Sequence, residues 1–263
     1  MAIHGWRNNM EYGLIGEKLG HSYSKIIQEK LLEDYTYEIH PIEKEDLDAF
    51  MKAKAFKGIN VTIPYKQSVI PYLDEMDEAA KKIGAVNTIV NKDGLLKGYN
   101  TDYYGFLYTL DKNNIEIKDK KVLVVGDGGA SKAIQAAVLA KHPKQLIITN
   151  RTPHENTISM KEVYVNHTDC DVIINTTSVG MYPNIDNNPI DVSKFSELKA
   201  VIDIIYNPLC TKFLLQGKEL GIPYVNGLEM LVAQAKYALE HFKDISIEDS
   251  EINRIYKELL KTI

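Results

Sequence analysis

The sequence predicts an α/β protein of two domains, and three observations support this prediction. The chain has 263 residues, whereas one domain has on the order of 150. Short apolar runs alternate with helical patterns, as in βαβ units that form a mainly parallel sheet. The alternation starts again at Lys121, after a helical segment at 103–110 and a polar stretch at 111–120. We therefore expect the chain to enter a second domain across residues 103–120.

Composition argues against several classes of protein. An apolar share of 44% with 25% charged residues is ordinary for a soluble globular enzyme. The net charge is −5 and no run of five or six Lys/Arg occurs, which argues against a nucleic-acid surface. Residues 1–7 lack the apolar core of a signal peptide, and no segment approaches ~18 consecutive apolar residues. We therefore expect a cytoplasmic protein without a membrane span, with Cys170 and Cys210 as buried thiols.

Apolar spacing predicts the elements of the first half. The segment 70–83 is expected to form one helix, because its apolar residues recur at helical spacing. The runs 86–90 and 95–99 flank the turn Asn91-Lys92-Asp93-Gly94 and predict a hairpin. The other expected elements are strands at 12–16, 35–39 and 58–63 and helices at 23–33 and 44–55.

The second half predicts a parallel sheet covered on both faces, because its strand-like runs are apolar throughout. Only 23 residues separate Arg151 from Asn175, so the crossover helix between them should be short or missing. Two amphipathic helices are expected after Gly227. The expected strands are 122–125, 145–149, 171–175 and 200–205, with a helix after the first.

A glycine-rich turn follows the strand at 122–125 and precedes a helix. It reads Gly126-Asp127-Gly128-Gly129-Ala130-Ser131, with serine in the third glycine's place of a G-x-G-x-x-G pattern. Backbone N–H groups at such a turn can hold a dinucleotide's pyrophosphate. The next strand ends in Asn150-Arg151-Thr152, and arginine there suits a 2′-phosphate. The turn predicts binding of NADP rather than NAD, the alternative being a plain tight turn beside a solvated arginine.

A lysine and several hydroxyl groups stand at other strand ends. Lys66 closes the segment Asn60-Val61-Thr62-Ile63-Pro64-Tyr65-Lys66, outside the carboxyl edge where open sheets bind ligands. Most lysines are solvated surface charges, and Asp102 has a structural interpretation as a helix cap. Ser22 and Ser24 could cap the first helix or receive a substrate carboxylate. His21 is assigned no role.

These segments, in their order along the chain, resemble the shikimate dehydrogenase family from about Glu11 to the C-terminus. The matching segments are Tyr12 to Gly16, Gly20 to Ser24, Gly58 to Lys66, Gly84 to Ile89, Gly98 to Asp102, Gly126 to Ala130, Asn150 to Thr152, Asn175 to Met181, Asp203 to Pro208, and Gly227 to Ala235.

The resemblance implies the reversible reduction of 3-dehydroshikimate to shikimate by NADPH, in the shikimate pathway of aromatic amino acid biosynthesis. It implies a substrate-binding domain of residues 1–102 plus 228–263 and a Rossmann-like NADP-binding domain of residues 103–227. Lys66 would donate or accept the proton, paired with Asp102. The implied substrate residues are Ser22, Ser24, Thr62, Lys66, Asn87, Asp102, Tyr206 and Gln234. The implied cofactor residues are Gly126, Asp127, Gly128, Gly129, Ala130, Asn150, Arg151, Thr152, Ile204 and Gly227, with no metal.

The chain departs from the family pattern at two places near the expected cofactor. Asp127 stands where the family usually has a small apolar residue, and a carboxylate there would repel pyrophosphate unless its side chain points away. After Arg151 the chain reads Pro153-His154-Glu155, where the family often has another basic residue. Two alternatives stay open: a quinate/shikimate dehydrogenase of broader specificity, and a nucleotide-binding regulatory protein without turnover. The protein would be a monomer or a homodimer.

Overall fold

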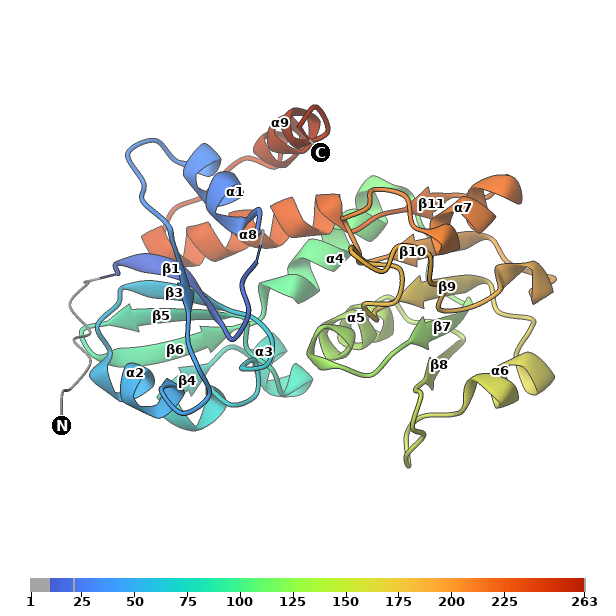
Figure 1. Cartoon of the computed structure of the whole chain (residues 1–263), viewed down its shortest axis with the longest axis horizontal. Helices are drawn as coiled ribbons and strands as arrows, with labels where there is room; N and C mark the ends of the chain where they lie inside the picture. Colours follow the sequence, from blue (N-terminus) through green and yellow to red (C-terminus); the bar gives the residue numbers. More distant parts are fainter. Residues whose placement is uncertain (1–9, 21, 263) are drawn as a thin grey trace. The chain divides into compact units, whose positions relative to one another are not determined.

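The computed structural model describes residues 10–20 and 22–262 (Figure 1); the expectations for residues 1–7 and His21 fall outside them. The chain divides into two compact units. Residues 1–100 and 238–247 form the first unit, and residues 101–237 and 248–263 form the second. The predicted α/β fold of two domains is confirmed. The C-terminal helices are shared between the units, whereas the expected division placed all of 228–263 with the first domain.

The first unit is built on a six-stranded sheet in the order β2-β1-β3-β5-β6-β4. β1 pairs in parallel with β2 and β3, while β5 is antiparallel to both β3 and β6. The predicted hairpin is confirmed as β5 and β6. The strands are β1 (Tyr12–Gly16), β2 (Glu38–Pro41), β3 (Gly58–Val61), β4 (Glu75–Met76), β5 (Thr88–Lys92) and β6 (Leu95–Tyr99), and the helices are α1 (Ser24–Leu31), α2 (Leu47–Ala53), η1 (Ile70–Tyr72) and α3 (Glu78–Ile83).

The single helix predicted over 70–83 is wrong. The segment forms the 3-10 turn η1, the short strand β4 and the helix α3. Asp74 interrupts any helix, because its N–H donates to the carbonyl of Leu96 while its carboxylate accepts from the Leu96 N–H. Asp77 then starts α3 by accepting from the N–H of Ala80 at 2.7 Å, as an N-cap does. Ile70, Leu73, Met76 and Ala80 still pack on one core with β3, β5 and α2. Their helical spacing therefore comes from a turn, a strand and a helix in succession, not from one helix.

The second unit holds a five-stranded parallel sheet in the order β11-β10-β9-β7-β8. Alternate residues of β7 face opposite cores: Val122 and Val124 pack with α4 and α5, while Leu123 and Val125 pack with α6 and α7. The predicted sheet with two covered faces is confirmed. Its strands are β7 (Lys121–Val125), β8 (Gln145–Thr149), β9 (Val172–Asn175), β10 (Ala200–Asp203) and β11 (Tyr224–Val225).

The crossover between β8 and β9 is short, as predicted, because α6 has only 7 residues. Lys236 donates to the Asp249 carboxylate at 3.1 Å, which joins the start of α9 to the part of α8 in the second unit. Cys170 is a buried free thiol, whereas Cys210 is partly exposed. The helices are α4 (Thr101–Lys112), α5 (Gly129–Ala140), α6 (Met160–Asn166), η2 (Val192–Lys194), α7 (Lys212–Glu219), α8 (Leu228–Lys243) and α9 (Ser250–Leu259).

Among the helices of residues 10–20 and 22–262, none combines the length and the apolar character that a bilayer crossing requires.

Candidate functional site

Four strand termini meet at one edge of the first sheet, and five of the predicted substrate residues lie on the segments next to them. β1 and β3 run in parallel, so both end at this edge. β5 is antiparallel to β3 and starts here, and β6 ends opposite that start. The N–H of Val61 donates to the Asn87 carbonyl at 2.8 Å, and the N–H of Thr62 donates to the Ile15 carbonyl at 2.9 Å. The topology therefore brings the segments that carry Ser22, Ser24, Thr62, Lys66 and Asn87 to one edge of one sheet.

The first helix begins beside two serines, but neither caps it in the expected way. The N-cap position is Tyr23, and no capping bond from its side chain occurs in this described segment. Instead, the Ser22 hydroxyl accepts from the N–H of Ser24 at 3.2 Å. Both serines are half-buried, in the stretch that leads from β1 into α1.

Lys66 lies in a turn that several backbone and side-chain hydrogen bonds hold in place. The N–H of Tyr65 donates to the Thr62 carbonyl at 2.9 Å, and the N–H of Val69 donates to the Tyr65 carbonyl at 3.1 Å. The buried Tyr65 hydroxyl donates to the Ile42 carbonyl at 2.6 Å. The Lys66 carbonyl itself accepts from the N–H of Val86 at 2.8 Å. The backbone that carries the half-buried Lys66 side chain is therefore held in place before any ligand binds.

A buried polar network orients Asn87, and sequence reasoning assigned no role to its other members. The Tyr37 hydroxyl donates to Asn60 Oδ1 at 2.6 Å. Asn60 Nδ2 donates to the Asn87 carbonyl at 3.2 Å and to the Thr88 hydroxyl at 3.0 Å. That hydroxyl donates to Asn87 Oδ1 at 3.0 Å. Burial also raises the pKa of the Tyr37 hydroxyl, which keeps it a neutral donor.

The remaining predicted substrate residues belong to the second unit. Asp102 is buried in the first turn of α4, where a carboxylate is favoured by the helix dipole. Gln234 is half-buried on α8, and its Nε2 donates to the Leu231 carbonyl at 2.9 Å. Tyr206 is half-buried in the segment after β10.

The expected cofactor residues Ile204 and Gly227 are in direct backbone contact. A Cβ placed on Gly227 would lie 1.9 Å from the Ile204 carbonyl oxygen, so only glycine fits there. The N–H of Gly227 donates to the Ile205 carbonyl at 2.9 Å. The structure thus brings together two residues that lie 23 positions apart in the sequence.

The glycine-rich turn follows β7, the strand at which the strand order of the second sheet reverses. β7 lies between β8 and β9, and ligands bind at such a switch point, outside the carboxyl ends of the strands. Gly126 has φ +102, and a Cβ there would lie 2.9 Å from the Thr176 hydroxyl. α5 begins at Gly129 with Gly128 as its N-cap, so its first N–H groups have no intrahelical acceptor. Ser131, in the third glycine's place, is buried, and its hydroxyl donates to the Gly126 carbonyl at 2.7 Å.

The carboxylate of Asp127 is engaged by two side chains. Its Oδ1 accepts from Gln135 Nε2 at 2.8 Å, and its Oδ2 lies 2.9 Å from His154 Nε2. Arg151 is exposed in the loop after β8, the same loop that carries His154. The two departures from the family pattern, Asp127 and His154, are therefore partners of each other.

A second buried network of hydrogen bonds lies at the ends of β9 and β10. Asp203, fully buried at the end of β10, accepts from Asn175 Nδ2 at 3.0 Å, from the N–H of Ile205 at 3.0 Å and from the Thr211 hydroxyl at 2.7 Å. Burial raises the pKa of Asp203 to about 6, although the three hydrogen bonds oppose this shift. Asn175 and Asp203 begin two of the matched segments, but nothing in the sequence indicates that their side chains meet.

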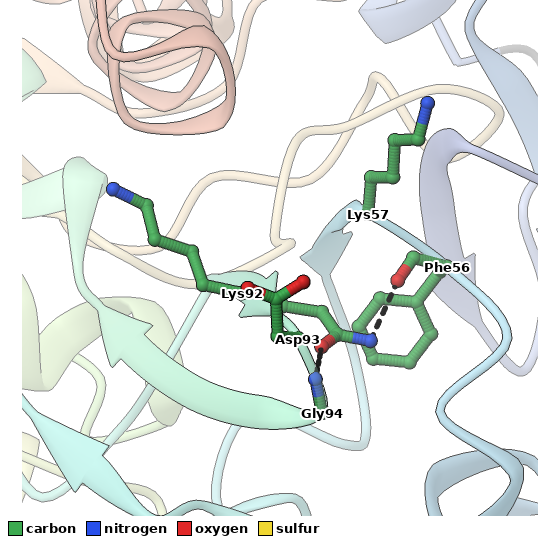
Figure 2. A pocket seen from close by; sticks show the side chains of 6 residues that line it. Phe56, Lys57, Lys92, Asp93 and Gly94 are labelled. Atoms are coloured by element: carbon green, nitrogen blue, oxygen red, sulfur yellow. Dashed lines mark hydrogen bonds between the residues drawn. The ribbon is translucent and has the colours of Figure 1, made fainter.

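A surface hollow elsewhere in the first unit holds none of the predicted site residues in the described chain (Figure 2). Asn91 supports it, because its Nδ2 donates to the Phe56 carbonyl at 2.8 Å and its Oδ1 accepts from the N–H of Gly94 at 2.8 Å. Both lysines that line it are ion-paired outside it, Lys57 with Glu11 and Lys92 with Asp244. The residues around the hollow therefore hold the β5–β6 turn in place. Its lining residues are Phe56, Lys57, Asn91, Lys92, Asp93 and Gly94.

Comparison with known proteins agrees with the motifs. The family model described as "Shikimate dehydrogenase substrate binding domain" matches residues 14–89. A protein of Clostridium beijerinckii named shikimate dehydrogenase (NADP(+)) is 41% identical over 259 residues, which span 93% of this chain and 96% of that protein.

Solved structures agree as well. A crystal structure of a chorismate mutase/shikimate 5-dehydrogenase fusion protein from Clostridium acetobutylicum matches with a TM-score of 0.90 and 39% identity, over 97% of this chain and 99% of that chain. A crystal structure of shikimate 5-dehydrogenase from Thermus thermophilus, in complex with NADP(H) and shikimate, matches with a TM-score of 0.85 and 28% identity, over 95% of this chain and 99% of that chain. An identity near 40% over almost the whole length shows that this chain belongs to the shikimate dehydrogenase family.

Proposed function

We propose that this chain catalyses the reversible, NADP-dependent reduction of 3-dehydroshikimate to shikimate, as a step in aromatic amino acid biosynthesis. The observation that supports the proposal is the sheet edge to which the topology brings the segments of the fixed lysine turn, the two serines, Thr62 and the oriented Asn87. A substrate with one carboxylate and several hydroxyls requires such polar groups. The relatives named above are NADP-dependent shikimate dehydrogenases, which supports the same reaction and cofactor.

The substrate carboxylate is assigned to Ser22, Ser24 and Tyr206. The two serines lie at the start of α1, where the N–H groups of the first turn and the helix dipole favour an anion. The ring hydroxyls are assigned to Thr62, Asn87, Asp102 and Gln234. A buried polar group left unpaired by a poorer substrate costs about 1–3 kcal/mol, so this set also discriminates among substrates.

Lys66 is assigned as the proton donor and acceptor, with Asp102 as its partner. NADPH, when bound, supplies the hydride that adds to the ketone carbon. The ketone oxygen then gains negative charge, and the Lys66 ammonium stabilises that charge and gives its proton to the oxygen. In the oxidation of shikimate the Lys66 amine takes the hydroxyl proton, and bound NADP would accept the hydride from the carbon. The fixed turn around Lys66 supports this role, because a positioned group loses less freedom on reaching the transition state.

The cofactor is assigned to the glycine-rich turn and to the loop after β8. The N–H groups at the start of α5 would hold the pyrophosphate, and a bidentate arginine at Arg151 would hold the 2′-phosphate. Asn150 and Thr152 flank that arginine, and Ile204 and Gly227 would border the other end of the dinucleotide. A metal has no assigned part in this reaction.

The direct test mixes purified protein with shikimate and NADP and follows absorbance at the reduced-nicotinamide band. Rapid reduction of NADP with shikimate, and much slower reduction with quinate or NAD, is the expected result. Comparable rates with quinate would instead assign the broader quinate/shikimate activity, which the names of the relatives do not favour. Folded protein without turnover in any combination would assign the regulatory alternative.

A further inference from the structure

The loop that carries Arg151 is closed at its neck. The N–H of Asn150 donates to the Ile158 carbonyl at 3.1 Å, and the N–H of Ile158 donates to the Ile148 carbonyl at 2.9 Å. The Thr149 hydroxyl donates to the same Ile158 carbonyl at 2.9 Å. The chain therefore leaves β8 and returns to it within eight residues, 150 to 157. This segment is called the arginine loop below.

The tip of the arginine loop is also ordered. The N–H of His154 donates to the Thr157 hydroxyl at 2.9 Å, and the N–H of Thr157 donates back to the His154 carbonyl at 2.9 Å. This reciprocal pair fixes the backbone of His154. From this held backbone the imidazole reaches Asp127.

One continuous set of hydrogen bonds joins the loop tip to the glycine-rich turn. His154 Nε2 meets Asp127 Oδ2 at 2.9 Å. Gln135 Nε2 donates both to Asp127 Oδ1 at 2.8 Å and to the Ser131 hydroxyl at 3.0 Å. The Ser131 hydroxyl donates to the Gly126 carbonyl at 2.7 Å. The helix α5, the turn before it and the arginine loop are thus tied together by four side chains, of which Asp127 and His154 depart from the family pattern.

The carboxylate of Asp127 makes the hydrogen bonds of this arrangement strong. The side chain is only 17% exposed, against 48% for His154. Both carboxylate oxygens are directed to side-chain donors, and hydrogen bonds to a charged group are stronger than neutral ones. The bond to His154 therefore anchors the loop more firmly than a bond between neutral groups would.

We propose that Asp127 and His154 form a bridge that positions the arginine loop for recognition of the 2′-phosphate, and so contributes to the preference for NADP over NAD. His154 and Asp127 are positioning residues here, because they act through Arg151 rather than on the phosphate. The inference rests on the cofactor placement proposed above, in which Arg151 holds the 2′-phosphate.

The test measures dissociation constants by calorimetry, for NADP and NAD separately, without turnover. We expect His154→Ala to weaken NADP about tenfold and NAD less than about twofold. His154→Gln should stay within about twofold of the wild type for both, because the glutamine Nε2–H can replace the imidazole donor. Asn156→Ala, an exposed neutral change in the same loop, is the matched control and should alter neither constant.

A double-mutant cycle separates positioning from direct contact. Arg151→Gln should by itself remove most of the preference, and adding His154→Ala should then change NADP binding less than about twofold. Full additivity of the two effects would overturn the bridge, because His154 would then act independently of Arg151. Equal weakening of NADP and NAD by His154→Ala would overturn it too.

Failure of the cofactor placement has a different signature. If Arg151→Gln leaves the preference intact, the arginine does not hold the 2′-phosphate, and the placement and the bridge both fall. If Arg151→Gln removes the preference while His154→Ala leaves it unchanged, only the bridge is overturned. Circular dichroism melting of each variant checks that the loop changes leave the fold intact.

Discussion

Replacing Asp203 with asparagine removes a buried ionisable group while keeping its shape. Asp203 Oδ1 accepts from Asn175 and from the N–H of Ile205, and Oδ2 accepts from the Thr211 hydroxyl. An asparagine Oδ1 can keep the first two bonds, and its Nδ2 can donate to Thr211. Asp203→Asn therefore changes the charge of the network more than its packing.

The magnitude follows from the raised pKa. Burial raises the pKa of Asp203 to about 6, from about 3.9 in an unfolded chain. At a pH between these two pKa values, Asp203 is protonated in the native state and ionised in the unfolded state. Its contribution to the free energy of unfolding therefore falls as pH rises. Each tenfold change in proton affinity is worth about 1.4 kcal/mol. The unfolded carboxyl is already partly protonated at pH 4, so Asp203 lowers the free energy of unfolding of the wild type by about 2 kcal/mol between pH 4 and pH 7. The asparagine variant has no such term.

The assay is urea unfolding followed by circular dichroism at several pH values from 4 to 8. The free energy of unfolding of Asp203→Asn minus that of the wild type should increase by about 2 kcal/mol across this range. Asp93→Asn, at an exposed turn position, removes the same charge and is the control, with an expected change near zero. A difference that stays flat with pH, or a carbon-13 titration that places the Asp203 pKa near 4, would refute the reasoning.

Four further predictions concern the site and its supports. Lys66→Met should lower kcat by about 10²- to 10⁴-fold and KM much less, whereas the exposed Lys82→Met should leave steady-state rates unchanged. Wild-type oxidation of shikimate should speed up as pH rises, because the amine must be deprotonated to accept a proton; a flat pH–rate profile with chemistry rate-limiting would contradict this. Tyr37→Phe should cost about 1–3 kcal/mol in urea unfolding, because buried Asn60 Oδ1 loses its short bond from Tyr37 and keeps only Gln28 Nε2 at 3.5 Å. Gly105→Ala should cost about 1–3 kcal/mol in the same assay, because its Cβ would lie 2.9 Å from a backbone oxygen of α8; an unchanged midpoint would show that the helices can separate.

The sequence predicted most of the fold where one local signal dominated. Three kinds of element lie close to their expected bounds: the apolar strands, the Asp93-Gly94 turn of the hairpin and the glycine-rich turn after β7. The segment 70–83 failed because hydrogen bonds from Asp74 to the distant Leu96 override the local preference for helix. Likewise, nothing local in α9 reveals that its start pairs with Lys236.

The candidate site shows the same division between local and long-range information. Lys66, Ser22 and Asn87 could be proposed from motifs, and sheet topology brings their segments to one edge. The partnership of Asp127 with His154 spans 27 residues, and that of Asp203 with Asn175 spans 28. Such pairs depend on which side chains the packed structure brings into contact, and no periodicity in the sequence encodes them.

The contact between Gly227 and the Ile204 carbonyl places the backbone after β10 directly against the backbone before α8. No side-chain layer separates the two backbones, so no rotamer change can absorb a displacement of one against the other. Gln234 lies seven residues further along α8, about 10 Å at 1.5 Å per residue. Tyr206 lies two residues beyond Ile204. We therefore expect a displacement of the Tyr206 segment to be transmitted to Gln234.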